Sequence, residues 1–282
     1  GAIISNNAGG YSFSQSGANG RILRYVFNQF DQPGRYLYLR DNESKDFWSA
    51  SWQPVGKDTS LYQNECRHGL GYTRMTAEYG GVFSEALYYV PLGKSYEVWS
   101  LQVTNHTDLQ KKLTLTGYAE FSNHNNYEQD QVNLQYSLFI TNTRFEKNRI
   151  MQQIHGNLDK LAEGKKVDGK NMLERFFALA GAEVSSYCGD KDTFLGKYHG
   201  YGDPQGVALG NLGNAVSYNE NACGALSCTV SLAPGETKRI VFLLGMKDSA
   251  EAGAIADAYE NPADTVAREL EELKAYWDEK LR

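Results

Sequence analysis

The stretch "CGALSCTVSLAPGETKRIVFLLGM" (residues 223–246) carries two runs of apolar and β-branched residues on either side of Pro234-Gly235. Apolar and β-branched residues favour extended strands, and a Pro-Gly pair favours a tight turn. The stretch therefore predicts a pair of strands joined by a turn.

Similar runs recur along the chain, separated by turn residues. They lie at 35–40, 69–91, 95–121 and 175–187. The 69–91 run reads as two strands around a Gly-Gly turn, and the 95–121 run as two strands around an "NHTD" turn. Many short strands with little helix are typical of an antiparallel sandwich or barrel, so we expect a mainly β fold.

The C-terminal stretch 261–282 differs from this pattern. Pro262 suits the first turn of a helix, and an apolar stripe follows at three- and four-residue spacing, formed by Val266, Leu270, Leu273 and Trp277. We expect a β domain over residues 1–250 and a helical linker over 251–282, with the stripe covered by the sandwich or by a further domain. Residues 155–172 are charged and interrupted by glycine, which predicts a solvated insertion.

Composition excludes several classes of protein. The 282 residues carry a net charge of −6 without a basic block, so we expect no nucleic-acid partner. No apolar run approaches the roughly 20 residues that span a bilayer, and "GAIISNNAGG" at the start is unlike a signal peptide. The cysteines lack a CxxC pair, which predicts buried free thiols, no metal site and a cytoplasmic location; they are Cys66, Cys188, Cys223 and Cys228.

Catalytic motifs are absent from the sequence. It contains no phosphate-binding glycine loop, GxSxG or HExxH. The acidic stretch "GDKDTFLGKY" (189–198) reads most simply as a polar turn leading into a strand. We therefore expect neither a catalytic residue nor a cofactor in this chain.

The stretch "DFWSASWQPVG" (46–56) places Trp48 and Trp52 four residues apart. Indole faces stack on the C–H faces of sugars, which makes a carbohydrate platform one interpretation. The alternative is that one or both rings fill the sandwich core, as tryptophan commonly does.

An unusual polar connection, "HNNYEQDQVNLQY" (124–136), lies between expected strands at 113–121 and 137–143. Its thirteen residues exceed the usual length of a strand connection and offer almost nothing apolar to bury. On the residues alone it reads as a solvated loop.

Several stretches together resemble a known family. In order they are "NNAGGYSF", "GRYLYLRD", "FWSASWQPV", "ECRHGLGYTRM", "GYAEFSNHNN", "DTFLGKY" and "LAPGETKRIVFLLG". They resemble the N-terminal domain of the inverting β-glucoside phosphorylases of glycoside hydrolase family 94, in particular the cellobiose phosphorylases. The resemblance implies an antiparallel β-supersandwich like that of galactose mutarotase, followed by a helical linker and an (α/α)6 barrel that holds the catalytic Asp. Inorganic phosphate would be the co-substrate, and no cofactor is implied.

The same resemblance gives the polar connection a role. In these enzymes the corresponding loop reaches from one subunit of a homodimer toward the active site of the other. Asn126 and Asn133 match two family asparagines and Gln135 matches a glutamine, whereas Tyr136 stands where the family has Arg. Loss of that guanidinium puts cellobiose itself in doubt as the substrate.

Two further classes of protein stay open on the sequence. A free-standing β-glucan-binding module would use Trp48 and Trp52. A mutarotase-like epimerase would need a His and a carboxylate in one pocket, and no such pair is identifiable from the sequence.

Overall fold

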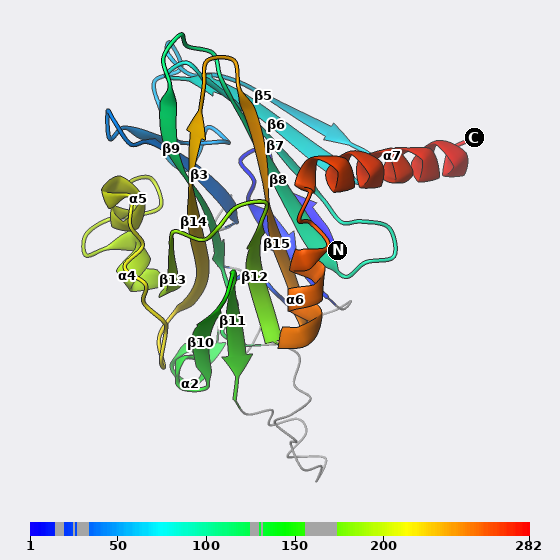
Figure 1. Ribbon diagram of the computed structural model, residues 1–282. Coiled ribbons are helices and arrows are strands. Elements are labelled where there is room, and N and C mark those ends of the chain that lie inside the picture. The colour runs from blue at the N-terminus through cyan, green and yellow to red at the C-terminus, as the bar shows by residue number, and fades with distance from the viewer. Residues whose placement is uncertain (15–19, 25, 27–33, 125–129, 131, 156–173) are drawn as a thin grey trace.

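The computed structural model describes residues 1–14, 20–24, 26, 34–124, 130, 132–155 and 174–282 (Figure 1). Most of the strands in these residues lie in two antiparallel sheets. The larger has the strand order β10 (Thr141–Glu146), β11 (Arg149–Ile154), β12 (Glu174–Ala180), β15 (Thr237–Lys247), β8 (Tyr96–Asn105), β7 (Val82–Tyr89), β6 (Tyr72–Tyr79) and β5 (Gln63–Gly69). The smaller has the order β13 (Ser186–Asp190), β14 (Ala222–Leu232), β9 (Lys111–Glu120), β3 (Arg35–Asp41) and β4 (Phe47–Ser49). The predicted antiparallel, mainly β fold is confirmed.

The turn at Pro234-Gly235 joins the two sheets. β14 and β15 form on either side of it as predicted, but they do not pair with each other: β14 pairs with β9, whereas β15 pairs with β8. Gly235 has φ +72°, a conformation that favours glycine. The turn after β8 also crosses between the sheets, and the buried Asn105 side chain donates to the carbonyls of Leu232 and Ala233 at 3.1 and 3.2 Å. These contacts fasten the two crossings together at one end of the sandwich.

Three apolar cores result from this arrangement. The first lies between the sheets and includes Leu37, Trp99 and Phe242. The second covers the outer face of the eight-stranded sheet beneath α6 (Ser249–Asp257) and α7 (Pro262–Lys280). The third covers the outer face of the five-stranded sheet beneath α4 (Lys191–Leu195) and α5 (Gln205–Leu209). Because β3 and β12 are covered on both faces, all of their residues are buried.

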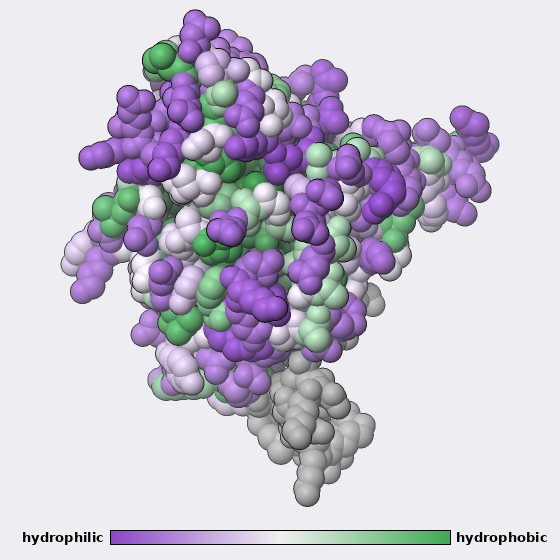
Figure 2. Space-filling view, in the orientation of Figure 1, coloured by the Kyte–Doolittle hydropathy of each residue, from purple (hydrophilic) through white to green (hydrophobic). Residues whose placement is uncertain are grey.

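The predicted C-terminal helix is confirmed as α7, and its apolar stripe packs on the sandwich. Val266, Leu270 and Leu273 are buried in the second core, with Trp277 at its edge. The remaining face of α7 is mainly hydrophilic, as Figure 2 shows. None of the helices in the described part of the chain is both long and apolar enough to cross a bilayer.

Other expectations need correction. The run 175–187 is two strands rather than one, because β12 ends at Ala180 and Gly181 follows with φ +84°. The stretch 189–198 is not a plain turn: the Asp190 carboxylate accepts the Thr193 N–H and starts α4. The cysteines Cys188, Cys223 and Cys228 are buried free thiols as predicted, whereas Cys66 is only half-buried. The 155–172 insertion lies almost wholly outside the described residues.

Candidate functional site

The polar connection ends in a short helix, α2 (Leu134–Phe139), at the end of the molecule opposite α7 (Figure 1). Asn133 is the N-cap residue of α2, and its carbonyl oxygen accepts a hydrogen bond from the Ser137 hydroxyl at 3.1 Å. The strand expected from Ser137 to Thr143 starts only at Thr141, because residues 134–139 are helical. The simple loop expected from the sequence is therefore replaced, at its C-terminal end, by a helix.

The predicted site residues differ in exposure. The side chains of Asn133 and Gln135 are exposed, and Tyr136 is half-buried. Asn126 lies outside the described residues, so the structure does not place it beside the other three. The two exposed amides each offer donors and an acceptor to a polar ligand.

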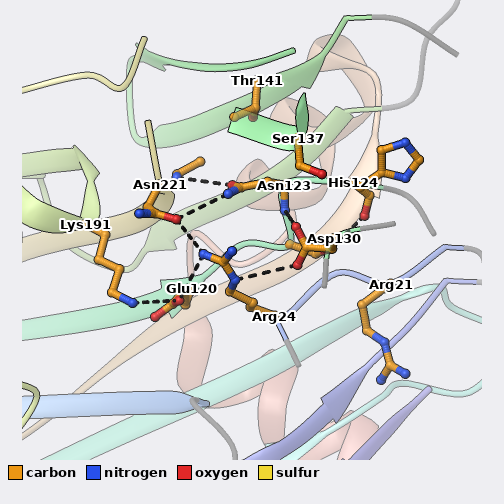
Figure 3. A network of polar contacts seen from close by, with 12 residues as sticks. Arg21, Arg24, Glu120, Asn123, His124, Asp130, Ser137, Thr141, Lys191 and Asn221 are labelled. Carbon is orange, nitrogen blue, oxygen red and sulfur yellow. Dashed lines mark hydrogen bonds and ion pairs between the residues drawn. The ribbon is translucent and has the colours of Figure 1, made fainter. Parts of the chain in front are cut away.

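A buried polar network lies at the base of α2 (Figure 3). Asp130 is only 2% exposed although it belongs to the polar connection. Its Oδ1 accepts the backbone N–H of Asn123 at 3.0 Å, and its Oδ2 lies 3.6 Å from Nε of Arg24. Burial raises the pKa of Asp130 above its ordinary value, against the opposing effect of the Arg24 charge.

Arg24 extends the network to β9 and β14. Its Nη1 donates to Oδ1 of Asn221 at 2.6 Å and lies 3.7 Å from Oε1 of Glu120. The Lys191 ammonium group also contacts Glu120 Oε1, at 3.0 Å, and the Tyr201 hydroxyl donates to Oε2 of the same carboxylate. Both buried carboxylates are thus neutralised by neighbouring cations.

Arg175, on β12, holds the first residue of the polar connection. It is almost fully buried, and its Nη2 donates to the carbonyl oxygens of His124 at 3.1 Å and Arg21 at 2.7 Å. Burial lowers the pKa of Arg175 to about 10, so the guanidinium stays charged at neutral pH. The Gln152 side chain adds a bond to the Ser122 carbonyl at 3.1 Å.

This arrangement suits binding rather than proton transfer. A general acid or base must come within hydrogen-bond reach of its substrate. In the network at the base of α2, the carboxylates Glu120 and Asp130 are buried and engaged, whereas Asn133 and Gln135 present exposed amides. Among the described residues of this site, hydrogen bonding to a polar ligand is therefore the chemistry available.

The tryptophan platform does not form as a pair. Trp48 is 1% exposed and packs against Tyr79 in the core between the sheets, so neither face of its ring is open to a sugar. Trp52 is half-buried against the same core, and its Nε1–H donates to the Lys57 carbonyl at 2.8 Å. The interpretation in which tryptophan fills the core is therefore correct for Trp48.

Comparison with known proteins shows the family to which this chain belongs. The sequence model for the supersandwich domain of glycosyl hydrolase 94 matches residues 1–262. This chain therefore belongs to the glycosyl hydrolase 94 supersandwich family, as the sequence motifs predicted.

Curated relatives include phosphorylases. The chain is 34% identical over 281 residues to the N,N'-diacetylchitobiose phosphorylase of Vibrio proteolyticus, covering 99% of this chain and 33% of that protein. It is 29% identical over 225 residues to the solabiose phosphorylase of Paenibacillus borealis, covering 77% of this chain and 26% of that protein. The chain thus spans about a third or less of the length of these relatives.

A solved structure supports the fold alone. A bacterial glucoamylase complexed with acarbose aligns with a TM-score of 0.50 at 9% identity, over 98% of this chain and 36% of that chain. At this identity the likeness concerns the architecture and carries no functional argument.

Proposed function

We propose that this chain is the N-terminal domain of an inverting phosphorylase that cleaves a β-linked disaccharide with inorganic phosphate. The supersandwich family and the phosphorylase names of the relatives support the class of reaction. Inversion needs an acid to protonate the leaving oxygen and a nucleophile on the opposite ring face. Phosphate is already an anion, so the second carboxylate of a hydrolase is unnecessary. The acid itself would lie in a barrel outside this chain, and this chain alone would be inactive.

The proposed substrate is a β-linked disaccharide other than cellobiose. Tyr136 replaces the arginine that the resemblance to cellobiose phosphorylases would require at this position, and a phenol cannot hold an anion bidentately. The 34% identical relative is named for N,N'-diacetylchitobiose. We therefore place N,N'-diacetylchitobiose first among the substrates to assay, with cellobiose as the comparison.

The domain's own contribution would be to support a homodimer and to extend α2 to the partner's active site. One observation carries this proposal. Asn133 and Gln135 present exposed amides, and the chain just before them is held by a buried ion pair through Asp130. Exposed side chains bind a ligand more tightly when their backbone is already fixed, because less conformational entropy is then lost on binding. Tyr136, on the same helix, belongs to this proposal, and Asn126 is included only on the resemblance. The proposal also keeps the cytoplasmic location and a domain boundary near residue 250.

Mixed dimers of the full-length protein test the proposal directly. One subunit carries Asn133→Ala, and the other carries a substitution of the catalytic Asp in its barrel. If α2 serves the partner's site, the site with an intact acid receives an intact α2 from the other subunit. The acid variant alone should show no phosphorolysis, and we expect the intact site of the mixed dimer to recover a kcat/KM several-fold above that of the Asn133→Ala dimer.

Asn133→Ala by itself should reduce kcat/KM by several-fold, since a hydrogen bond to a neutral partner is worth about 0.5–1.5 kcal/mol. Its free energy of unfolding should change by less than about 0.5 kcal/mol, because Asn133 is exposed and its side chain makes no capping hydrogen bond at the start of α2. Asn64→Ala, at an exposed amide on the edge strand β5, is the matched control and should leave kinetics unchanged. Absence of recovery in the mixed dimers would refute action in the partner's site. Tight binding of a disaccharide by this chain alone would favour a free-standing binding module.

A further inference from the structure

The ion pair between Arg24 and Asp130 is poorly arranged for stabilising the fold. Arg24 Nε and Asp130 Oδ2 are 3.6 Å apart, and Arg24 Nη1 and Glu120 Oε1 are 3.7 Å apart; both distances are longer than a charged hydrogen bond. The side chains of Arg24 and Asp130 are only 9% and 2% exposed, so both lose most of their hydration on folding. Burying two charges costs several kcal/mol unless the geometry is excellent, and a well-packed apolar pair often stabilises a protein as much or more. The raised pKa of Asp130 agrees with this imbalance.

The location of the pair indicates another role. Asp130 lies three residues before the N-cap residue of α2, and its Oδ1 is bonded to the backbone of Asn123, three residues after β9 ends. Arg24 is tied in turn to Asn221, at the start of β14, by a 2.6 Å bond. The approach to α2 is therefore connected to the ends of two neighbouring strands of the five-stranded sheet. A buried carboxylate accepts few alternative positions, because any displacement would leave it unpaired.

We propose that the Arg24–Asp130 pair is a positioning element, which fixes α2 and its exposed amides against the sandwich while adding little to the stability of the fold. The effect of this pair on catalysis rests on the function proposed above, whereas its effect on the position of α2 does not. Arg24 and Asp130 are positioning residues in this account, since both are buried and act through Asn133 and Gln135.

Hydrogen exchange of this 282-residue chain tests the structural part. The variants are Asp130→Asn and the apolar pair Arg24→Met/Asp130→Leu. Loss of the charged contact should make the Ser137 amide, which donates to the Asn133 carbonyl at 3.0 Å, exchange at least about tenfold faster. The urea midpoint of the double variant should stay at the wild-type value. Lys111→Met, which removes a 2.7 Å pair with Asp41 outside this network, is the control and should leave exchange at Ser137 unchanged.

Three results would overturn the inference. Unchanged exchange at Ser137 in both variants would mean that the pair does not position α2. Equal losses of exchange protection throughout the sandwich and at α2, or a urea midpoint of the apolar double variant well below the wild-type value, would mean that the pair is a structural element. In the full-length protein, Asp130→Asn should raise KM for the disaccharide several-fold with a smaller change in kcat. Faster exchange at Ser137 without a change in KM would uphold the positioning role and count against the proposed function of α2.

Discussion

The buried ion pair between Arg35 and Glu97 allows a quantitative prediction. Arg35 is fully buried and Glu97 is 3% exposed, and their side chains are joined by two hydrogen bonds of 2.7 and 3.1 Å. Arg35 also donates to the Tyr11 carbonyl at 2.8 Å and to the Ser12 hydroxyl at 2.7 Å, which fixes β2 (Gly10–Ser12) to the sandwich. This pair therefore has the close geometry that the Arg24–Asp130 pair lacks.

Arg35→Met should destabilise the chain by about 3–5 kcal/mol, the usual cost of leaving one charge of a buried pair without its partner. After the substitution, the described residues leave Glu97 with the Trp99 Nε1–H, at 3.0 Å, as its remaining hydrogen-bond donor. The loss is large against the roughly 5–15 kcal/mol typical of a domain. The double variant Arg35→Met/Glu97→Leu should recover most of it, because no buried charge then remains.

Urea unfolding followed by circular dichroism measures these differences, provided that the dependence on urea is the same for all variants. The control is Arg67→Met, which breaks a 2.8 Å pair with Glu65 whose side chains are 72% and 55% exposed. That change should have little effect on stability, because water and salt screen an exposed ion pair. A cost for Arg35→Met no larger than for Arg67→Met would refute the reasoning, and so would a double variant less stable than Arg35→Met alone.

Two further predictions concern acid stability and the C-terminal helix. Burial alone would raise the pKa of Asp41, but the 2.7 Å bond from Lys111 and two backbone N–H groups outweigh it and lower that pKa. The lowered pKa means that the charged Asp41 stabilises the fold above a pH of about 4 and that this stabilisation is lost as the pH falls further. Asp41→Asn should therefore lower the free energy of unfolding in urea by about 1 kcal/mol at pH 7 and by less at pH 3. An equal loss at both pH values would contradict this reasoning. Leu273→Ala, at a buried position of α7, should lower the free energy of unfolding by about 2–5 kcal/mol, whereas Glu279→Ala on the exposed face should have almost no effect; equal effects of the two would show that α7 does not pack as described.

The strands were predictable because their signals are local. Gly80-Gly81 and Pro234-Gly235 mark turns by backbone chemistry, and strand-like runs flank both. The pairing of these strands was not predictable in the same way. Gly80-Gly81 makes a true hairpin of β6 and β7, whereas Pro234-Gly235 passes the chain between sheets, and the difference depends on contacts with distant strands.

The short helices and the buried network could not be predicted from the sequence, for physical reasons. The five residues of α4 are too few to show a helical period, although Asp190 is a residue type that favours the N-cap position. Asp130 stands among polar residues, so composition predicted solvent exposure. Its burial follows from Arg24, a residue far away in the sequence, and no local pattern records that contact.

The strand β15 contributes side chains to two apolar cores, one on each face of the eight-stranded sheet. Ile240, Phe242 and Leu244 pack between the sheets, whereas Val241 and Leu243 pack beneath the C-terminal helices. Loosening on one side of this strand therefore disturbs the side chains on its other side. The two cores should therefore unfold together in one cooperative transition, and the C-terminal helices should not unfold while the sandwich stays folded.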